Sequence, residues 1–234
     1  MRRGPYRLVL TGALGLGLGF GAIGETGCSP DFHDGLGPRV PVLNVSGQAE
    51  RDGTPAASLD VSVRNPVDSV PIASTKTDAN GSYEIGAPSG IWEIRIKGKV
   101  AGDFDSVTRG FVIDGQGERV TMVPMDVFAY GATLRTPLDA STVSLPSGSD
   151  PVGFAWRAAG RPFLSARVQV YDSNGAAVWY SGKGQDSTAT WDGTGNQGEF
   201  AGVSMPPATY TWRVKFDLPD SSDARTKSQT VTFQ

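Results

Sequence analysis

Hydrophobic and polar residues alternate with a period of two along much of the chain after residue 40. In residues 91–97, Trp92, Ile94 and Ile96 share one face of an extended strand, while charged residues occupy the positions between them. The same alternation recurs in residues 59–64, 167–171 and 210–217. Because successive side chains of a strand point to opposite faces, this pattern predicts strands with one buried face. No stretch after residue 30 keeps an apolar stripe of helical period over three turns, so we expect an all-β chain.

Short strands separated by Gly, Pro, Asn and Asp are typical of β-sandwiches. Asn80-Gly81 and Asn174-Gly175 predict tight hairpin turns, because both residue types tolerate left-handed backbone angles. Residues 120–128 read as one long strand, after which a turn-rich stretch begins. We therefore expect two consecutive β-sandwich domains of about 100 residues each, at 40–130 and 131–234.

The first 27 residues have the character of a targeting segment. Arg2, Arg3 and Arg7 give a positive start, and residues 8–24 carry no charge but contain several glycines. This uncharged run is slightly shorter than the roughly 20 residues that span a membrane, so a cleaved signal is favoured over a permanent transmembrane helix. Residues 28–39 contain Pro and Gly without periodicity, which predicts a tether.

The sequence Glu25-Thr26-Gly27-Cys28 resembles the lipobox of bacterial lipoproteins, although Glu25 stands where an aliphatic residue is preferred. The resemblance implies that residues 1–27 are a lipoprotein signal peptide and that Cys28 carries lipid and anchors the chain to a membrane. Ser29 after the cysteine implies the outer membrane of a Gram-negative cell envelope. The alternative is an ordinary cleaved signal peptide and a periplasmic or secreted protein.

Composition excludes several kinds of site. One Cys cannot form an internal disulfide or a cysteine-based zinc site, and His33 is the single histidine and falls in the predicted tether. The formal net charge of −3 gives no electrostatic footprint for nucleic acid. We therefore expect no cofactor, no metal site, no catalytic residues and no nucleic-acid partner.

The first expected domain, residues 40–130, resembles the carboxypeptidase regulatory-like family, which has a prealbumin-like sandwich fold. The resemblance is carried by a Pro-led alternating strand at 55–63, by a Thr-Asp-x-x-Gly-x-Tyr turn at 77–83, and by Pro88, Gly90 and Trp92. Members of this family are accessory modules, so the resemblance implies scaffolding or binding and not peptidase activity.

The second half has an Ig-like signature. Residues 151–156 resemble the opening strand of a fibronectin-III-like or Ig-like domain, and residues 191–198 read Trp-Asp-Gly-x-x-x-x-Gly. With Pro206, Ala208 and Tyr210, these residues resemble the Ig-like repeat of the flagellar hook-cap protein, in which Gly stands at the position of Ala208. The resemblance concerns the module alone and implies the same sandwich fold.

Candidate ligand contacts are few. Trp92, Trp156, Trp191 and Trp212 fit inward-facing positions, whereas Tyr180 is the best candidate for an exposed aromatic that contacts a ligand. The acidic residues near 103–105 and 220–223 fall in turn-rich stretches, and we expect solvated loops there. The Asp-x-Asn-Gly sequences at 78–81 and 172–175 are expected to be turns and not calcium loops.

The resulting hypothesis is a non-enzymatic, lipid-anchored cell-envelope protein that binds or scaffolds an unknown protein or glycan partner. One alternative is a carbohydrate-binding accessory protein, which an exposed aromatic beside polar side chains would support. Another is a structural component of an envelope or secretion assembly, which an exposed apolar patch would support. A hydrolase with a carboxylate-only or metal-dependent site would need converging acids in a concave pocket.

Overall fold

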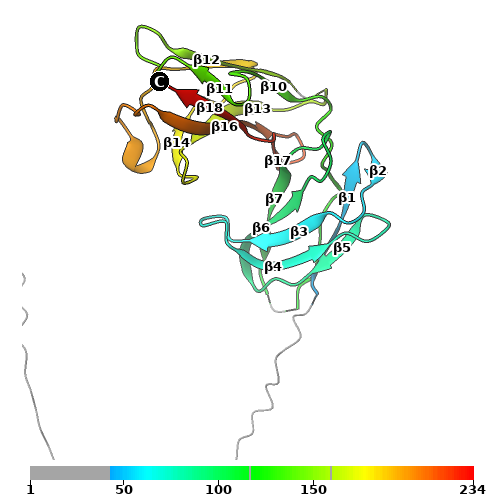
Figure 1. Cartoon of the computed structure of the whole chain (residues 1–234). Coiled ribbons are helices and arrows are strands. Elements are labelled where there is room, and N and C mark those ends of the chain that lie inside the picture. The colour runs from blue at the N-terminus through cyan, green and yellow to red at the C-terminus, as the bar shows by residue number, and fades with distance from the viewer. Residues whose placement is uncertain (1–42, 116, 159) are drawn as a thin grey trace, which may run out of the picture. The chain divides into compact units, whose positions relative to one another are not determined.

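The computed structural model describes residues 43–115, 117–158 and 160–234 (Figure 1). The predicted signal peptide, Cys28, His33 and the tether lie outside these residues. A search of the described residues found no helix with the length and apolar character needed to cross a membrane.

The first half of the described chain contains nine strands. They are β1 (Val45–Arg51), β2 (Thr54–Pro55), β3 (Asp60–Arg64), β4 (Pro71–Lys76), β5 (Ser82–Ile85), β6 (Gly90–Lys97), β7 (Ser106–Ile113), β8 (Val120–Thr121) and β9 (Met125–Asp126). β1 is the centre of one sheet, in which it pairs with β2 and β5 antiparallel and with β8 and β9 parallel. β4, β3, β6 and β7 follow one another in a second, antiparallel sheet.

The second half repeats the two-sheet arrangement. Its elements are β10 (Thr133–Thr136), β11 (Ser141–Val143), β12 (Val152–Arg157), β13 (Ser165–Tyr171), β14 (Ala177–Tyr180), β15 (Thr188–Trp191), the 3-10 helix η1 (Gly198–Phe200), β16 (Ala208–Asp217), β17 (Ser222–Arg225) and β18 (Gln229–Phe233). One sheet has the order β10-β12-β15. In the other, β16 pairs with β13 on one edge and with β17 and β18 in succession on its other edge.

A hydrogen-bonded ladder joins the two halves. β17 lies between β16 and β7, with Ala224 opposite Val107 and Arg225 opposite Ser106. The sheet β4-β3-β6-β7 of the first half therefore continues into β17, β16 and β13 of the second half, in one ten-stranded sheet (Figure 1). The predicted fold class, all-β with two consecutive β-sandwiches, is confirmed, whereas a domain boundary at residue 130 stays a prediction.

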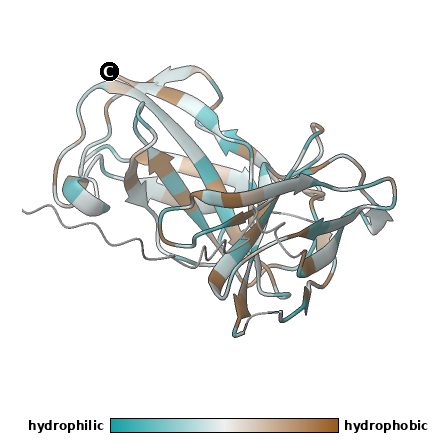
Figure 2. Cartoon of the chain, turned by 90° about the horizontal axis from the view of Figure 1, so that it is seen from below, coloured by the Kyte–Doolittle hydropathy of each residue, from teal (hydrophilic) through white to brown (hydrophobic). Residues whose placement is uncertain are grey.

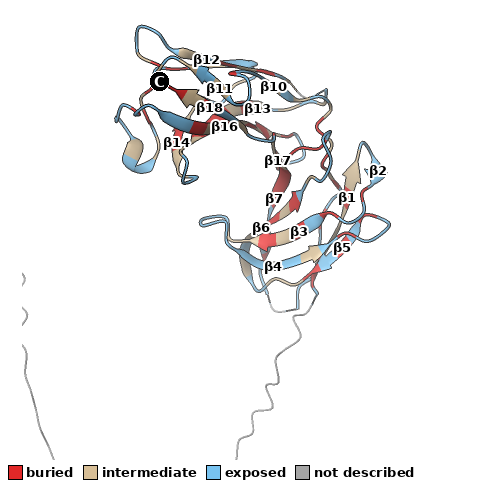
Figure 3. Cartoon of the chain, viewed as in Figure 1, coloured by how far each residue is buried: buried red, intermediate tan, exposed pale blue. Residues whose placement is uncertain are grey.

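The alternating residues of the sequence fill the core. Leu59, Val61 and Val63 are buried, as are Ile94 and Ile96 on β6. On the long strand β16, every second residue from Tyr210 to Phe216 is buried, and the positions between them point to the other face. Figure 2 shows the resulting alternation of hydrophobic and hydrophilic residues along the strands, and Figure 3 shows buried residues gathered on β7, in the middle of the joined sheet.

Aromatic rings join the two sheets of the second half. Phe154 on β12 packs edge-on against Trp212 on β16, with ring centroids 5.0 Å apart, and Trp191 on β15 meets Tyr210 at 5.9 Å. Trp156, Trp191 and Trp212 are buried as expected. Trp92 is only partly buried, because it lies at the margin of the core and donates its indole N–H to the Pro88 carbonyl oxygen at 2.8 Å.

One predicted hairpin is confirmed and the other is wrong. At Asn174-Gly175 the chain turns between the paired strands β13 and β14, and the Asp172 carboxylate accepts the backbone N–H groups of Asn174 and Ala176. At Asn80-Gly81 the Asp78 carboxylate makes the equivalent bonds, at 2.8 Å, to the N–H groups of Asn80 and Ser82. This second turn connects β4 to β5, which lie in different sheets. The same turn hydrogen bonds therefore join two sheets here and do not form a hairpin.

The long strand predicted at residues 120–128 is also wrong. Only Val120–Thr121 and Met125–Asp126 pair with β1, as β8 and β9. Pro124 falls between these two short strands. Proline has no N–H to donate to a ladder, so a single uninterrupted strand is not formed there.

Candidate functional site

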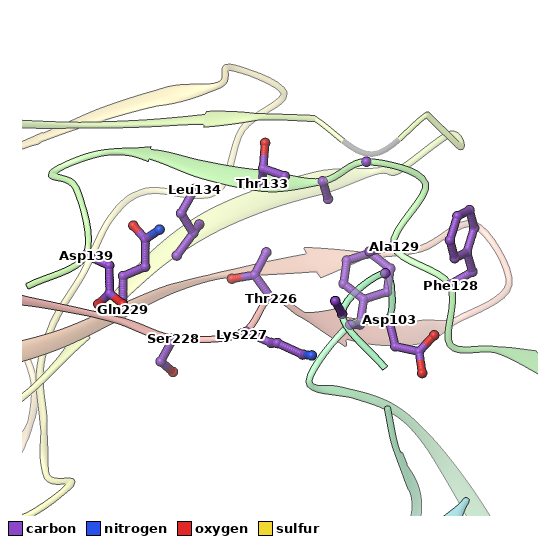
Figure 4. Close-up of a pocket in the computed structure, with 15 residues that line it drawn as sticks. Asp103, Phe128, Ala129, Thr133, Leu134, Asp139, Thr226, Lys227, Ser228 and Gln229 are labelled. Atoms are coloured by element: carbon purple, nitrogen blue, oxygen red, sulfur yellow. The ribbon is translucent and has the colours of Figure 1, made fainter. Parts of the chain in front are cut away.

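A cavity of about 550 Å³ lies where the two halves of the described chain meet (Figure 4). Its walls combine apolar groups from Phe104, Phe128 and Leu134 with polar groups from Lys227 and Gln229. Lys227 is already engaged, because its ammonium donates to the Val100 carbonyl oxygen at 2.8 Å. The side-chain oxygen of Gln229 is buried and has no partner, so a molecule held here would have to offer it a donor.

Asp103 lies beside this cavity, but its carboxylate is fully occupied. It accepts two 2.7 Å hydrogen bonds from the Arg51 guanidinium and two more from the backbone N–H groups of Lys99 and Val100. Burial alone would raise the pKa of Asp103, yet these hydrogen bonds outweigh it and hold the pKa below its ordinary value. A carboxylate fixed in this way is structural and is not poised to take up a proton.

The expectation of solvated acidic loops is therefore wrong at Asp103, which is 3% exposed. Asp105 pairs with Arg95 and Asp223 pairs with Lys215, both in partly buried positions. Asp220 is exposed but still contacts Arg109 at 2.7 Å. The sequence showed turns around these acids but carried no signal for Arg51 and Arg109, which reach Asp103 and Asp220 from strands distant in the chain.

Tyr180, the predicted ligand contact, lies at the end of β14 and is partly buried. The Arg167 guanidinium stacks over its ring at 4.8 Å from the centroid, and the Tyr171 ring meets it edge-on at 6.2 Å. Burial, together with the Tyr171 hydroxyl 3.5 Å away, raises the pKa of Tyr180 to about 12, so its hydroxyl stays protonated. The ligand contact at Tyr180 stays a prediction.

A second pair of the same kind stands beside the first. The Arg213 guanidinium lies over the Tyr171 ring at 4.6 Å and donates a 2.6 Å hydrogen bond to the Tyr171 hydroxyl. Its Nε donates to the Gln169 side-chain oxygen at 3.0 Å, and the Tyr171 hydroxyl donates to the same oxygen. Cation–π contacts thus orient both arginines on this side of β13 and β16, and hydrogen bonds hold Arg213 in addition.

Strand register places further arginines on this side of the joined sheet. Arg167 on β13 lies opposite Lys215 on β16, and Lys215 lies opposite Arg225 on β17. Arg95 projects from β6, two strands beyond β17. We call this surface the arginine–tyrosine face and define it by Arg64, Arg95, Arg167, Gln169, Tyr171, Tyr180, Arg213 and Arg225.

Positive charges on this face repel one another. Burial and the neighbouring guanidinium of Arg64 lower the pKa of Arg95. The charges of Arg225 and Arg213 also lower this pKa, whereas the charge of Asp105 raises it. Within the described ranges, Arg64, Arg167, Arg213 and Arg225 form no ion pair with a carboxylate. The Nε atoms of Arg95, Arg167 and Arg225 are buried without a hydrogen-bond partner. The arrangement is suited to binding a negatively charged group.

Neither site has the parts of a metal centre. The described residues include no group of three or more His, Cys, Asp or Glu side chains placed to hold a metal ion. The Asp-x-Asn-Gly segments are engaged in turns, and at Asp192 the carboxylate accepts the backbone N–H of Thr194 at 2.9 Å.

Comparisons with known proteins give no family for this chain. No protein-family model matches it, and no curated protein matches it. Among solved structures, the chain is similar to fibronectin(III)-like modules of CbhA from Clostridium thermocellum, with 15% identity, 82% of this chain and 91% of that chain covered, and a TM-score of 0.31.

Two further solved structures are similar to the same extent. A DUF3823 family protein from Parabacteroides merdae shares 9% identity, with 81% of this chain and 97% of that chain covered and a TM-score of 0.30. BcpA, the major pilin subunit of Bacillus cereus, shares 15% identity, with 81% and 69% covered and a TM-score of 0.30. Similarities this low say nothing about what this chain binds.

Proposed function

We propose that this chain is a non-enzymatic binding protein of the cell envelope, anchored by lipid on Cys28, and that it contacts its partner through the arginine–tyrosine face. The observation that carries the binding role is the set of arginines on that face without carboxylate partners. Neighbouring guanidinium charges without carboxylate partners repel one another, and a negatively charged ligand would relieve this repulsion. Tyr180 belongs to this surface through its contact with Arg167.

A binding role also agrees with the state of the acidic residues. Catalysis by a pair of carboxylates needs one group whose pKa is raised toward neutrality. Instead, the pKa values of Asp103, Asp217 and Asp220 are lowered by hydrogen bonds and neighbouring cations that outweigh their burial. These carboxylates stabilise the fold in their charged form.

To test the lipid anchor, the intact mass and the membrane partitioning are measured for the native protein and for the Cys28→Ser variant. We expect a mature chain that begins at Cys28 and carries acyl groups, because two or more acyl chains are needed for stable membrane attachment. The serine variant should appear in the soluble fraction. An unacylated, soluble native chain would contradict the anchor and leave a periplasmic or secreted binding protein.

A structural role in an envelope assembly is a second candidate, and one observation favours it. Ile91 on β6 and Val112 on β7 lie opposite each other in register and are 68% and 50% exposed. Paired exposed apolar side chains are typical of contact surfaces. If this role holds, Ile91→Ser should reduce the sedimentation or cross-linking of the chain with envelope proteins and leave its unfolding midpoint unchanged.

A further inference from the structure

We propose that the arginine–tyrosine face binds an acidic polysaccharide whose sugar rings carry carboxylates, an inference that names the ligand of the binding surface proposed above and so rests on that function.

The charge balance of the face favours an anion. Lys215 is neutralised locally, since it lies 2.6 Å from Asp223 and 3.9 Å from Asp217, and Arg95 has Asp105 at 3.2 Å. Glu93 and Lys97 on β6 share this side of the sheet and offset each other in charge. The other arginines of the face remain as the unpaired charge, although the whole chain is acidic with a net charge of −3.

The spacing of these arginines favours an extended ligand with repeated charges. Arg167, Lys215 and Arg225 are direct neighbours across β13, β16 and β17, and adjacent strands lie about 4.8 Å apart. Arg95 and Arg64 extend the cationic surface onto β6 and β3. A single small anion would meet one or two of these groups, whereas a chain with regularly repeated carboxylates can meet all of them.

The tyrosines hold the arginines in place and do not form a platform for a neutral sugar. One ring face of Tyr180 is covered by Arg167, and one ring face of Tyr171 is covered by Arg213. Stacking of a neutral sugar would need open aromatic faces, and these rings are instead used to orient guanidinium groups. An arginine oriented in this way can present its two parallel N–H groups to a carboxylate.

The position of the face within the sheet disfavours an acidic peptide. Peptides that bind sheets usually add a strand to a free edge, but β13, β16, β17, β6 and β3 all have neighbours on both sides. Ser62 on β3 lies opposite Arg95, and its hydroxyl accepts the Arg64 Nε–H but can still donate to a sugar hydroxyl group. Apolar anchor pockets of the kind that give peptide affinity are not part of the surface defined above.

The decisive experiment compares one polymer in charged and uncharged forms. The full chain is run in affinity gels or titrated calorimetrically with polygalacturonate, and then with the same polymer after methyl esterification. Binding to polygalacturonate that weakens with salt and falls at least about tenfold on esterification would support the proposal. Equal binding of both forms, or binding of neither, would overturn it.

Matched variants locate the site on the face. In Arg213→Gln/Arg225→Gln the affinity for polygalacturonate should fall by about tenfold or more, because two charge-assisted contacts are lost. The control variant Arg119→Gln/Arg135→Gln removes the same charge from exposed positions elsewhere. Its affinity for polygalacturonate should differ from that of the native chain by less than about twofold. An equal loss in both would show diffuse attraction and overturn the site. If the double variant is unstable, Arg213→Lys takes its place, because it keeps the charge but loses the fork of N–H groups. This variant should bind polygalacturonate more weakly than the native chain.

Binding of poly-L-glutamate tests the polysaccharide assignment separately from the proposed binding role of the face. If polyglutamate binds the face as tightly as polygalacturonate, the polysaccharide assignment is overturned while a binding role for the face survives. If no polyanion binds and the face variants leave all envelope contacts unchanged, both are overturned.

Discussion

The Arg51 guanidinium clamps the Asp103 carboxylate with two hydrogen bonds of 2.7 Å each. Arg51 ends β1, and Asp103 stands in the segment just before β7, so this pair connects the two sheets of the first half of the chain. The side chain of Asp103 is completely buried, whereas that of Arg51 is 32% exposed. The pair therefore lies at the rim of the core, where its charges are only partly solvated.

Arg51→Ala should lower the free energy of unfolding by about 3 kcal/mol, because it leaves a buried carboxylate without its charged partner. Urea denaturation measures this change. The exposed pair formed by Lys76 and Asp60 is the control, and Lys76→Ala should lower the free energy of unfolding by less than about 1 kcal/mol. Equal effects of the two substitutions would show that the Arg51 pair contributes no more than an ordinary surface pair.

Gly81 and Gly175 both end an Asp-x-Asn-Gly sequence and have similar positive φ angles of 73° and 80°, but different surroundings. A Cβ atom at Gly81 would lie 2.5 Å from the Ala49 carbonyl oxygen, whereas one at Gly175 would meet nothing within 4 Å. Gly175→Ala should cost about 1–2 kcal/mol for the left-handed backbone alone. Gly81→Ala should cost about 3 kcal/mol or more, because the backbone of β1 must also move. Thermal unfolding of the two variants side by side tests this difference.

Acid should weaken the fold partly through Asp217. Burial tends to raise its pKa, but the Lys183 ammonium 2.6 Å away and the Ser165 hydroxyl lower the pKa of Asp217 to about 2. A group whose pKa is lower in the folded state contributes stability that is present above its ordinary pKa and is lost as the pH falls through the folded value.

The contribution of Asp217 should thus be complete above its ordinary pKa of 3.8 and disappear as the pH falls to about 2. Asp217→Asn should be less stable than the native chain at about pH 6 and lose less stability on acidification. Urea midpoints measured across this range provide the test. Parallel pH curves for the two proteins would mean that Asp217 titrates alike in the folded and unfolded states.

Phe216 packs where the two halves meet, with ring centroids 5.9 Å from Phe104 and 5.3 Å from Phe163. The native chain should unfold in one transition, seen alike by circular dichroism and tryptophan fluorescence, because the halves share a sheet and this packing. Phe216→Ala should lower the free energy of unfolding by about 3–5 kcal/mol, since the residue is fully buried. The partly buried Phe200, the last residue of η1, is the comparison, and its replacement by Ala should have a smaller effect. Two separated transitions in the native chain would contradict the coupling.

The strands with clear alternation could be predicted from sequence because that pattern is short and local. Alternation alone identified the buried face of β16 and the core positions of β3. Pairing between strands is not local, and this is why the turn at Asn80-Gly81 was assigned to a hairpin although its flanking strands belong to different sheets.

The same limit applies to the candidate site. Tyr180 was singled out by its sequence, but Arg213 and Arg95 were read only as the polar positions of alternating strands. Their common surface depends on the pairing of Ala224 with Val107, which joins strands more than a hundred positions apart in the chain. No pattern within one strand records that pairing.

The crossing between the halves is itself tied down by backbone hydrogen bonds. The Val127 carbonyl oxygen accepts the Phe104 N–H at 2.8 Å, and the Ala129 N–H donates to the Gly102 carbonyl oxygen at 2.9 Å. Proteases cleave stretches that can be drawn out of the fold into an extended form. A protease that meets the folded chain should therefore not separate the halves at this crossing, so that both sandwiches are retained or degraded together.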